Sequence, residues 1–381
     1  MFDKDPRFSD SLSTDHLQEA ARLMTVCNSC RYCEGLCAVF PAMELRRSFA
    51  EGDLNYLANL CHSCAGCYQD CQFSPPHAFN VNVPQTLAKV RADSYAAYVW
   101  PPAMRPLFKR NGTAIAGIAA LSVAGFILGF ALWHDPAVLF RGGSFYALMP
   151  HNVMAGLFGA AFLYMLLATG LGLRAFWRDI GAQSLAAGTA SSLWQAMKDA
   201  ARLRHLDGGG VGCYNEDERP TDRRRIYHHL TFYGFLLCFA ATSTATVYHY
   251  VFGWPAPYGL FSLPKLFGIL GGIGLIVGPV GLAHTKARRH PDLKDGAARG
   301  MEAAFLLMLF GTGASGLLLM ILRETPAMGV ALSLHLGLVF ALFLTMPYGK
   351  FVHGIYRFAA LVLYARETEL QRPAEPPQDR S

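Results

Sequence analysis

The chain has 381 residues, 52% of them hydrophobic and only 16% charged, so it is too apolar for an ordinary soluble protein of this size. Its net charge is +6, yet neither an aromatic-rich single-strand platform nor a recognition helix accompanies the basic residues. We therefore expect no nucleic-acid partner, and we interpret the positive charge as the basic loops of a membrane protein.

Eight of the ten cysteines lie near the start of the chain, in two copies of the spacing C-x2-C-x2-C-x3-C that begin 34 positions apart. In two-cluster ferredoxins this spacing binds 4Fe-4S clusters, and the fourth cysteine of each run ligates the cluster of the other run. We expect two 4Fe-4S clusters, held by a first and a second quartet of cysteines. The first quartet is Cys27, Cys30, Cys33 and Cys71, and the second quartet is Cys61, Cys64, Cys67 and Cys37.

Zinc sites or disulfides would explain the same cysteines less well. Structural zinc usually needs two close pairs of ligands separated by a longer span, and disulfides need an oxidising compartment. The runs depart from the ferredoxin pattern at one point, because Ala38 and Gln72 stand where proline usually follows the fourth cysteine.

A helix is predicted at each cysteine run, because apolar residues recur at i, i+3, i+4 and i+7 from Leu17 and from Leu54. Ser13 and Asp53 are the expected N-caps of these helices. We therefore expect residues 1–90 to form a small helical ferredoxin-like iron–sulfur domain, called the head from here on.

Residues 91–111 are predicted to link the head to the membrane. Prolines make this segment semi-rigid, and Tyr95, Tyr98 and Trp100 suit the interface between lipid and water. We expect it to hold the head close to the bilayer.

Six segments contain no Asp, Glu, Lys or Arg and have the roughly 17–25 residues that a helix needs to cross a bilayer. They are residues 112–133, 153–173, 230–251, 266–282, 303–322 and 327–347. The remaining predicted divisions are 112–174 for the first two spans, 175–226 for a cytoplasmic amphipathic segment and loop, 227–366 for the last four spans with bound haem, and 367–381 for a disordered tail.

Lys and Arg are concentrated in the loops on one side of these predicted spans, while the other side offers little beyond Arg141, Lys265 and Arg323. The positive-inside rule therefore places both termini and the head in the cytoplasm. We expect a multi-pass protein of the cytoplasmic membrane.

Histidines at the ends of the spans form a second pattern. His335 and His353 are 18 residues apart, which is five turns if the last helix is continuous, so they would share one face at opposite membrane depths. On the third span His228 and His249 come close to sharing a face. Pairing His228 with His353 near the cytoplasmic surface, and His249 with His335 near the outer one, would bind two b haems.

Some histidines and cysteines leave alternatives open. His229 could replace His228 if its helix is kinked, and His151 could serve as an outer-side ligand. Cys238 is expected to pack within its span, whereas Cys213 could be a reactive thiol. Together these patterns predict an all-α fold, with a two-cluster ferredoxin-like head joined to a six-helix transmembrane bundle of the b-type cytochrome kind.

Four long strings carry a family resemblance: CRYCEGLCAVFPAMELRRSF at 30–49, CHSCAGCYQDCQFSPPHAFNVNVP at 61–84, HHLTFYGFLLCFAATSTATVYHY at 228–250 and LTMPYGKFVHGIYRFAALVLYARE at 344–367. The chain resembles the tricarballylate and citrate utilisation protein B family over nearly its whole length. That resemblance implies a membrane iron–sulfur protein that reoxidises the reduced flavin of a partner, an FAD-containing dehydrogenase that oxidises tricarballylate. The histidines at 228, 335 and 353 also resemble, more loosely, ligand positions of nitrate reductase gamma-type cytochromes.

The sequence therefore predicts an electron-transfer component with no catalytic residues of its own. Electrons would pass from a docked flavoprotein, with Arg31, Arg46 and Arg47 as docking residues, through the clusters and haem to quinone. A heterodisulfide-reductase-like subunit is one alternative, but only Cys213 could supply its extra thiol. A redox-sensing carboxylate transporter is another, although the spans lack the buried charges of a carboxylate carrier.

Overall fold

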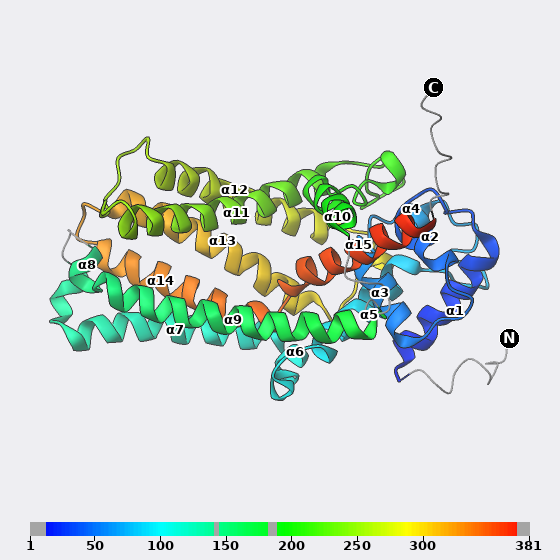
Figure 1. The fold of residues 1–381 in the computed structure, drawn as a ribbon, viewed down its shortest axis with the longest axis horizontal. Helices are drawn as coiled ribbons and strands as arrows, with labels where there is room; N and C mark the ends of the chain where they lie inside the picture. Colours follow the sequence, from blue (N-terminus) through cyan, green and yellow to red (C-terminus); the bar gives the residue numbers. More distant parts are fainter. Residues whose placement is uncertain (1–12, 141–144, 182–188, 372–381) are drawn as a thin grey trace, which may run out of the picture.

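Long apolar helices form most of the computed structural model, which describes residues 13–140, 145–181 and 189–371 (Figure 1). Six of them are long and apolar enough to cross a membrane, as predicted, so the chain is a multi-pass membrane protein. They are α7 (Asn111–Trp133), α9 (His151–Asp179), α11 (Arg223–Tyr250), α12 (Leu263–Ala287), α13 (Arg299–Leu322) and α14 (Met328–Thr345), the last extended by the short turn η5 (Met346–Tyr348).

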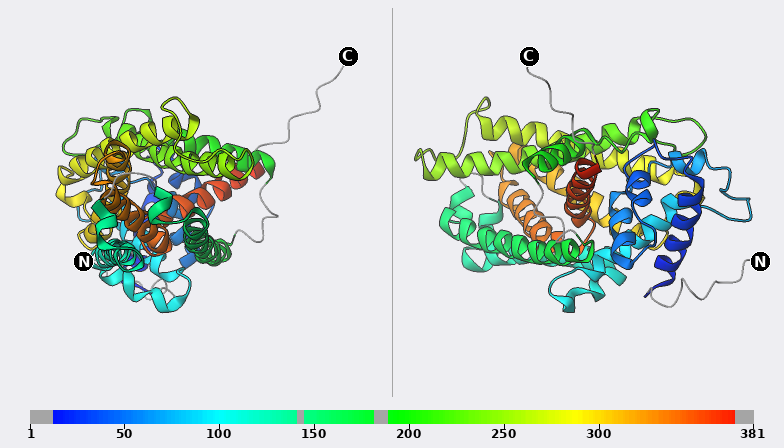
Figure 2. Two further views of the ribbon diagram at one scale, coloured as in Figure 1. Left: turned by 90° about the vertical axis from the view of Figure 1, so that its left-hand side faces the viewer. Right: turned by 45° about the vertical axis from the view of Figure 1, so that its right-hand side comes forward.

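The six helices run along the long axis of the molecule, and the head closes one end of the bundle (Figures 1 and 2). α11 packs along α12, α12 on α13, α13 on α14 and α7, and α14 also on α9. Glycines permit the closest of these approaches: a β-carbon on Gly271 of α12 would lie 2.8 Å from the carbonyl oxygen of Gly234 on α11. The glycines inside this span therefore serve helix packing.

Five short helices build the first part of the head: α1 (Asp15–Cys30), α2 (Val39–Glu44), α3 (Glu51–Leu60), α4 (Gly66–Gln69) and α5 (Val83–Ala97). The predicted helices are present, but both predicted caps are wrong. Thr14, in an extended conformation, caps α1 by accepting a hydrogen bond from the Leu17 amide at 3.3 Å. Ala50 occupies the cap of α3, and the Asp53 carboxylate accepts a bond from the Ala50 amide at 3.1 Å.

The end of the bundle departs from prediction, because the last helix is not continuous. α14 ends at Thr345, η5 contains Pro347, and a separate helix, α15 (Val352–Gln371), then begins. Pro347 removes one amide hydrogen from the helical ladder, and Gly349, which follows η5 in an extended conformation, ends the helix. α15 leaves the bundle and packs on α3, α9 and α10 (Ala190–Arg202).

The boundaries of the head therefore differ from the predicted ones. α15 belongs to the core of the head, where its Leu361 and Leu363 are buried with residues of α1 and α3. The predicted boundary at residue 90 falls inside α5, which continues to Ala97. Residues 367–371, predicted as a disordered tail, are the last turn of α15, and 372–381 lie outside the described residues.

Direct contacts fix the head to the bundle. A β-carbon on Gly52 of α3 would collide with the carbonyl oxygen of Asp179, the last residue of α9, so only glycine permits this approach. Asn55 donates a hydrogen bond to the Asp179 carboxylate at 3.1 Å, and Tyr98 donates to the same oxygen. The head is therefore packed against the membrane helices and does not depend on a flexible tether.

Arg46, expected on a docking surface, is instead a buried link between α15 and the rest of the head. Its side chain is only 11% exposed and pairs with Asp53 at 2.6 Å and Glu367 at 2.7 Å. Its guanidinium also lies 4.6 Å from the ring centre of Tyr56, whose hydroxyl donates to Glu367. Arg46 is therefore a structural residue.

Arg46→Ala is expected to destabilise the protein by about 3–5 kcal/mol, because Asp53 and Glu367 would lose their buried counter-charge. Thermal unfolding of the detergent-solubilised protein measures the change. Arg22→Ala is the matched control, since its pair with Glu19 is 44% and 42% exposed and should contribute about 0–1 kcal/mol. Equal effects of the two substitutions would contradict the assignment.

Candidate functional site

The structure gathers the eight cysteines of the head into the two predicted groups. A cavity of about 250 Å³ is lined by all four members of the first quartet, and Cys67 reaches it from the second. A smaller cavity of about 20 Å³ is lined by the second quartet together with His62 and His205. Cys71 thus joins the first run and Cys37 joins the second, as crossed ligation requires.

The free thiols of these cysteines have shifted pKa values. Burial, reinforced by the neighbouring thiols, raises the pKa of Cys27 and Cys33 to about 12, and it also raises that of Cys37. These thiols would be protonated and inert when free, and they would release protons on binding iron.

The two quartets differ in their surroundings. In the first, Cys30 is exposed beside Tyr32, whose side chain is 73% exposed, and Asp70 lies close to Cys33. In the second, Cys61 is buried at the end of α3, and its carbonyl oxygen accepts a hydrogen bond from Arg357 of α15. The first quartet is therefore the more exposed of the two.

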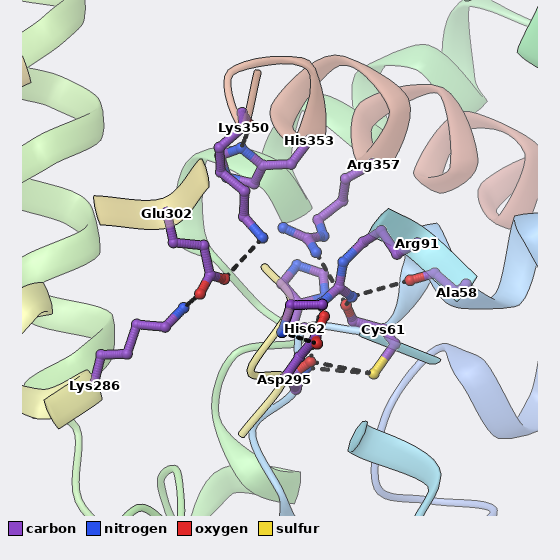
Figure 3. Close-up of polar contacts among 12 residues, drawn as sticks. Ala58, Cys61, His62, Arg91, Lys286, Asp295, Glu302, Lys350, His353 and Arg357 are labelled. Atoms are coloured by element: carbon purple, nitrogen blue, oxygen red, sulfur yellow. Dashed lines mark hydrogen bonds and ion pairs between the residues drawn. The ribbon is translucent and has the colours of Figure 1, made fainter. Parts of the chain in front are cut away.

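Four arginines, called the arginine shell, hold the chain around the second quartet. Each donates to backbone carbonyls of residues 58–63 (Figure 3 shows two of them). Among the described residues none of the four forms an ion pair with a carboxylate. The contacts are Arg91 to Ala58 at 3.0 Å and Cys61 at 2.5 Å, Arg357 to Asn59 at 3.2 Å and Cys61 at 3.0 Å, Arg224 to His62 at 3.0 Å and Ser63 at 2.5 Å, and Arg289 to Ser63 at 2.8 Å.

The shell brings like charges together in a buried place. Burial, followed by the charge of Arg224, lowers the pKa of Arg289 to about 9, and burial and Arg91 lower that of Arg357 to about 10. The Nε atom of Arg289 is buried without a hydrogen-bond partner. Guanidinium groups stay protonated at neutral pH, so this region has an excess of positive charge.

His228 and His353 meet one helical turn from the arginine shell. His228 follows Arg224 by four residues on α11, and His353 precedes Arg357 by four on α15, so each shares a helix face with its arginine. Their ring centres are 6.1 Å apart. Metal–imidazole bonds are about 2 Å long and the ring centre lies roughly 1 Å behind the nitrogen, so two imidazoles on one iron have centres about 6 Å apart.

Hydrogen bonding at this pair also fits iron ligation. His353 Nδ1 lies 2.5 Å from the Lys350 carbonyl oxygen, which leaves Nε2 for a metal. His228 Nδ1 is buried and has no partner. His229, the alternative ligand, faces Tyr233 instead, at 5.8 Å between ring centres.

The outer histidines do not form the predicted arrangement. Because α14 and α15 are separate, His335 and His353 do not share one helix face. His335 Nδ1 lies 3.0 Å from the Ser315 hydroxyl on α13, while His249 stacks on His151 of α9 with ring centres 3.6 Å apart. The stacked rings of His249 and His151 leave no room for an iron atom between them. The predicted second haem, held by His249 and His335, is therefore not supported by this arrangement.

A buried ion network borders the inner histidine pair. Glu302 of α13 pairs with Lys350 at 3.1 Å and with Lys286 of α12 (Figure 3). Burial lowers the pKa of Lys350 to about 8. Neither this network nor the arginine shell was predicted from the sequence, although the i, i+4 pairs Arg224–His228 and His353–Arg357 are visible in it.

The two remaining cysteines are not exposed reactive groups. Cys213 is fully buried against Leu203 and Leu206, near Cys64, and its thiol lies 3.5 Å from the Leu206 carbonyl oxygen. Cys238 packs on α12 at Gly271. A heterodisulfide-type reaction at Cys213 therefore lacks an accessible thiol.

Comparisons with known proteins agree with both halves of the chain. The family described as Citrate utilization protein B matches residues 112–374, and that described as Citrate utilization protein B Fer4-like domain matches residues 20–97. A curated protein of Escherichia coli named Citrate utilization protein B is 46% identical over 363 residues, which are 93% of this chain and 93% of that protein. No solved structure matches.

Proposed function

Because the chain belongs to the citrate utilization protein B family, we propose that it reoxidises the reduced flavin of a partner dehydrogenase and delivers the electrons to membrane quinone. When bound, two 4Fe-4S clusters and a b haem supply the one-electron chemistry. The family name connects the process to citrate, so the partner is an FAD-containing dehydrogenase acting on citrate or a similar tricarboxylic acid such as tricarballylate.

The order of the sites carries this proposal. The exposed first quartet, the buried second quartet and the His228–His353 pair follow one another from the surface into the bundle. Arg224 and Arg357 each hold the loop of the second quartet and stand one turn from a histidine of that pair. The second quartet and the proposed haem site would therefore lie next to each other, and this proximity supports electron transfer between them.

Residues of the chain position each step. Arg31, Tyr32 and Cys30 form the exposed edge at the first quartet, where the flavoprotein docks. Residues 58–63 are held rigid by the arginine shell, so the second quartet keeps a fixed distance to the bundle. His353, oriented by the Lys350 carbonyl, and His228 would hold the haem iron on the cytoplasmic side of the membrane.

Purified protein is expected to contain about eight non-haem irons, about eight acid-labile sulfides and one b haem. Iron, sulfide and pyridine-haemochrome assays on the full chain give these values. When the chain is co-expressed with a tricarballylate-oxidising flavoprotein, membranes should reduce quinone on addition of tricarballylate. Haem without sulfide, or sulfide without haem, would reject the proposed relay, because each half of the path needs its own cofactor.

A further inference from the structure

The arginine shell surrounds the second quartet alone among the described residues, because the cavity of the first quartet is lined by a single arginine, the exposed Arg31. Arg91, Arg224, Arg289 and Arg357 surround the loop of the second quartet without a carboxylate partner, whereas the first quartet has solvent on one side and Asp70 beside Cys33. Buried cations are rarely left uncompensated in proteins. An anionic occupant of the second quartet would supply the missing negative charge.

We propose that the arginine shell makes the cluster of the second quartet easier to reduce than that of the first, so that electrons entering at the surface are drawn inward. This inference rests on the proposed function, since it requires both clusters. It deepens that function by assigning the direction of transfer to four named side chains. The four arginines are thus positioning residues, because they bond the backbone of residues 58–63 and the Ser63 hydroxyl rather than the cysteine sulfurs.

Charge decides the sign of the effect. A 4Fe-4S cluster with four thiolates is negative and becomes more negative on reduction, so nearby cations favour the reduced form. Burial alone works in the opposite direction, because it disfavours the more highly charged state. Reduction adds one negative charge, whereas the shell holds four fixed positive charges in a place of low dielectric constant, so the cations prevail.

The geometry keeps those charges in place. Arg91 alone makes three hydrogen bonds, to Ala58, Cys61 and the Ser63 hydroxyl, and Arg357 also donates to the Cys61 carbonyl (Figure 3). A planar guanidinium held by several bonds cannot rotate away on reduction. The field at the second quartet is therefore built into the fold.

An EPR-monitored redox titration of the purified full chain tests the proposal. Arg91→Gln is expected to lower the midpoint potential of the higher-potential cluster by at least ~59 mV, which is a tenfold change in its ratio of reduced to oxidised form. The other cluster should shift less. Arg91→Lys keeps the charge and should recover most of the potential, whereas Arg22→Gln, an exposed substitution on α1, should leave both potentials unchanged.

Arg289→Gln provides a second variant in case Arg91→Gln does not fold, because Arg289 donates only to the Ser63 carbonyl. A downward shift of the same cluster in either variant supports the proposal. Unchanged potentials in the folded variants, a shift of the lower-potential cluster alone, or an equal shift in Arg91→Lys would overturn it. The proposed function fails separately, if the wild-type protein shows fewer than two clusters in the same titration.

Discussion

His353→Ala is expected to remove the b haem, with at least a tenfold loss of the reduced-minus-oxidised haem absorbance per protein. His353 and His228, whose ring centres are 6.1 Å apart, are the two imidazoles that would hold the iron, so either substitution would remove half of the proposed ligand pair. His228→Ala should have the same effect for the same reason. Quinone reduction should disappear with the haem, while both cluster signals persist, because the cysteine quartets lie in the head.

His229→Ala is the matched control for this experiment, since it removes the adjacent imidazole on α11, which faces Tyr233. It should retain the full haem spectrum. His249→Ala should retain it as well, because His249 stacks directly on His151. A full spectrum in both His228→Ala and His353→Ala would rule out this pair as the haem site.

Cys37→Ser is expected to abolish the cluster of the second quartet, although Cys37 lies in the first run of the sequence. The structure places Cys37 beside Cys61 and Cys64, so its loss opens that site. Iron and labile sulfide should fall by about half, and the higher-potential EPR signal should vanish. Electron transfer from the flavoprotein to quinone should drop at least tenfold, while dithionite still reduces the haem.

Cys71→Ser is the reciprocal variant and should remove the lower-potential cluster of the first quartet. Cys213→Ser serves as a control, because this buried thiol belongs to neither quartet. If Cys37→Ser removed the signal that Cys30→Ser removes, ligation would follow the runs of the sequence, and the crossed assignment would be wrong.

The membrane helices could be predicted from the sequence because their signal is local. Lipid requires a long stretch without charge, and each of the six windows satisfies that requirement by itself. The break between α14 and α15 was not predicted because proline is tolerated in membrane helices. Pro347 within an apolar stretch therefore did not by itself indicate the end of a helix. One consequence was the wrong placement of His335 and His353 on a single helix.

Three cysteines of each quartet could likewise be grouped from local spacing, because they lie within a few residues of chain, whereas the assignment of Cys71 and Cys37 came from the crossed pattern of two-cluster ferredoxins. The arginine shell could not be predicted in this way, since its contacts join residues 28 to 298 positions apart. Sequence periodicity reports which face of a helix is apolar, but it does not say which distant carbonyl a buried guanidinium meets. The proximity of His228 to His353 could be predicted because both lie at the same membrane depth, whereas the stacking of His249 on His151 depends on tertiary packing.

The position of α15 in the core of the head has a consequence for biosynthesis. Residues of α1, the first described helix, and of α15, the last, are buried in the same core. A ribosome releases α15 only after all six membrane helices have been made, so the earlier head helices wait without their packing partner. Maturation of the head is therefore post-translational, and a chain that stops before residue 352 would reach the membrane with an unfinished head.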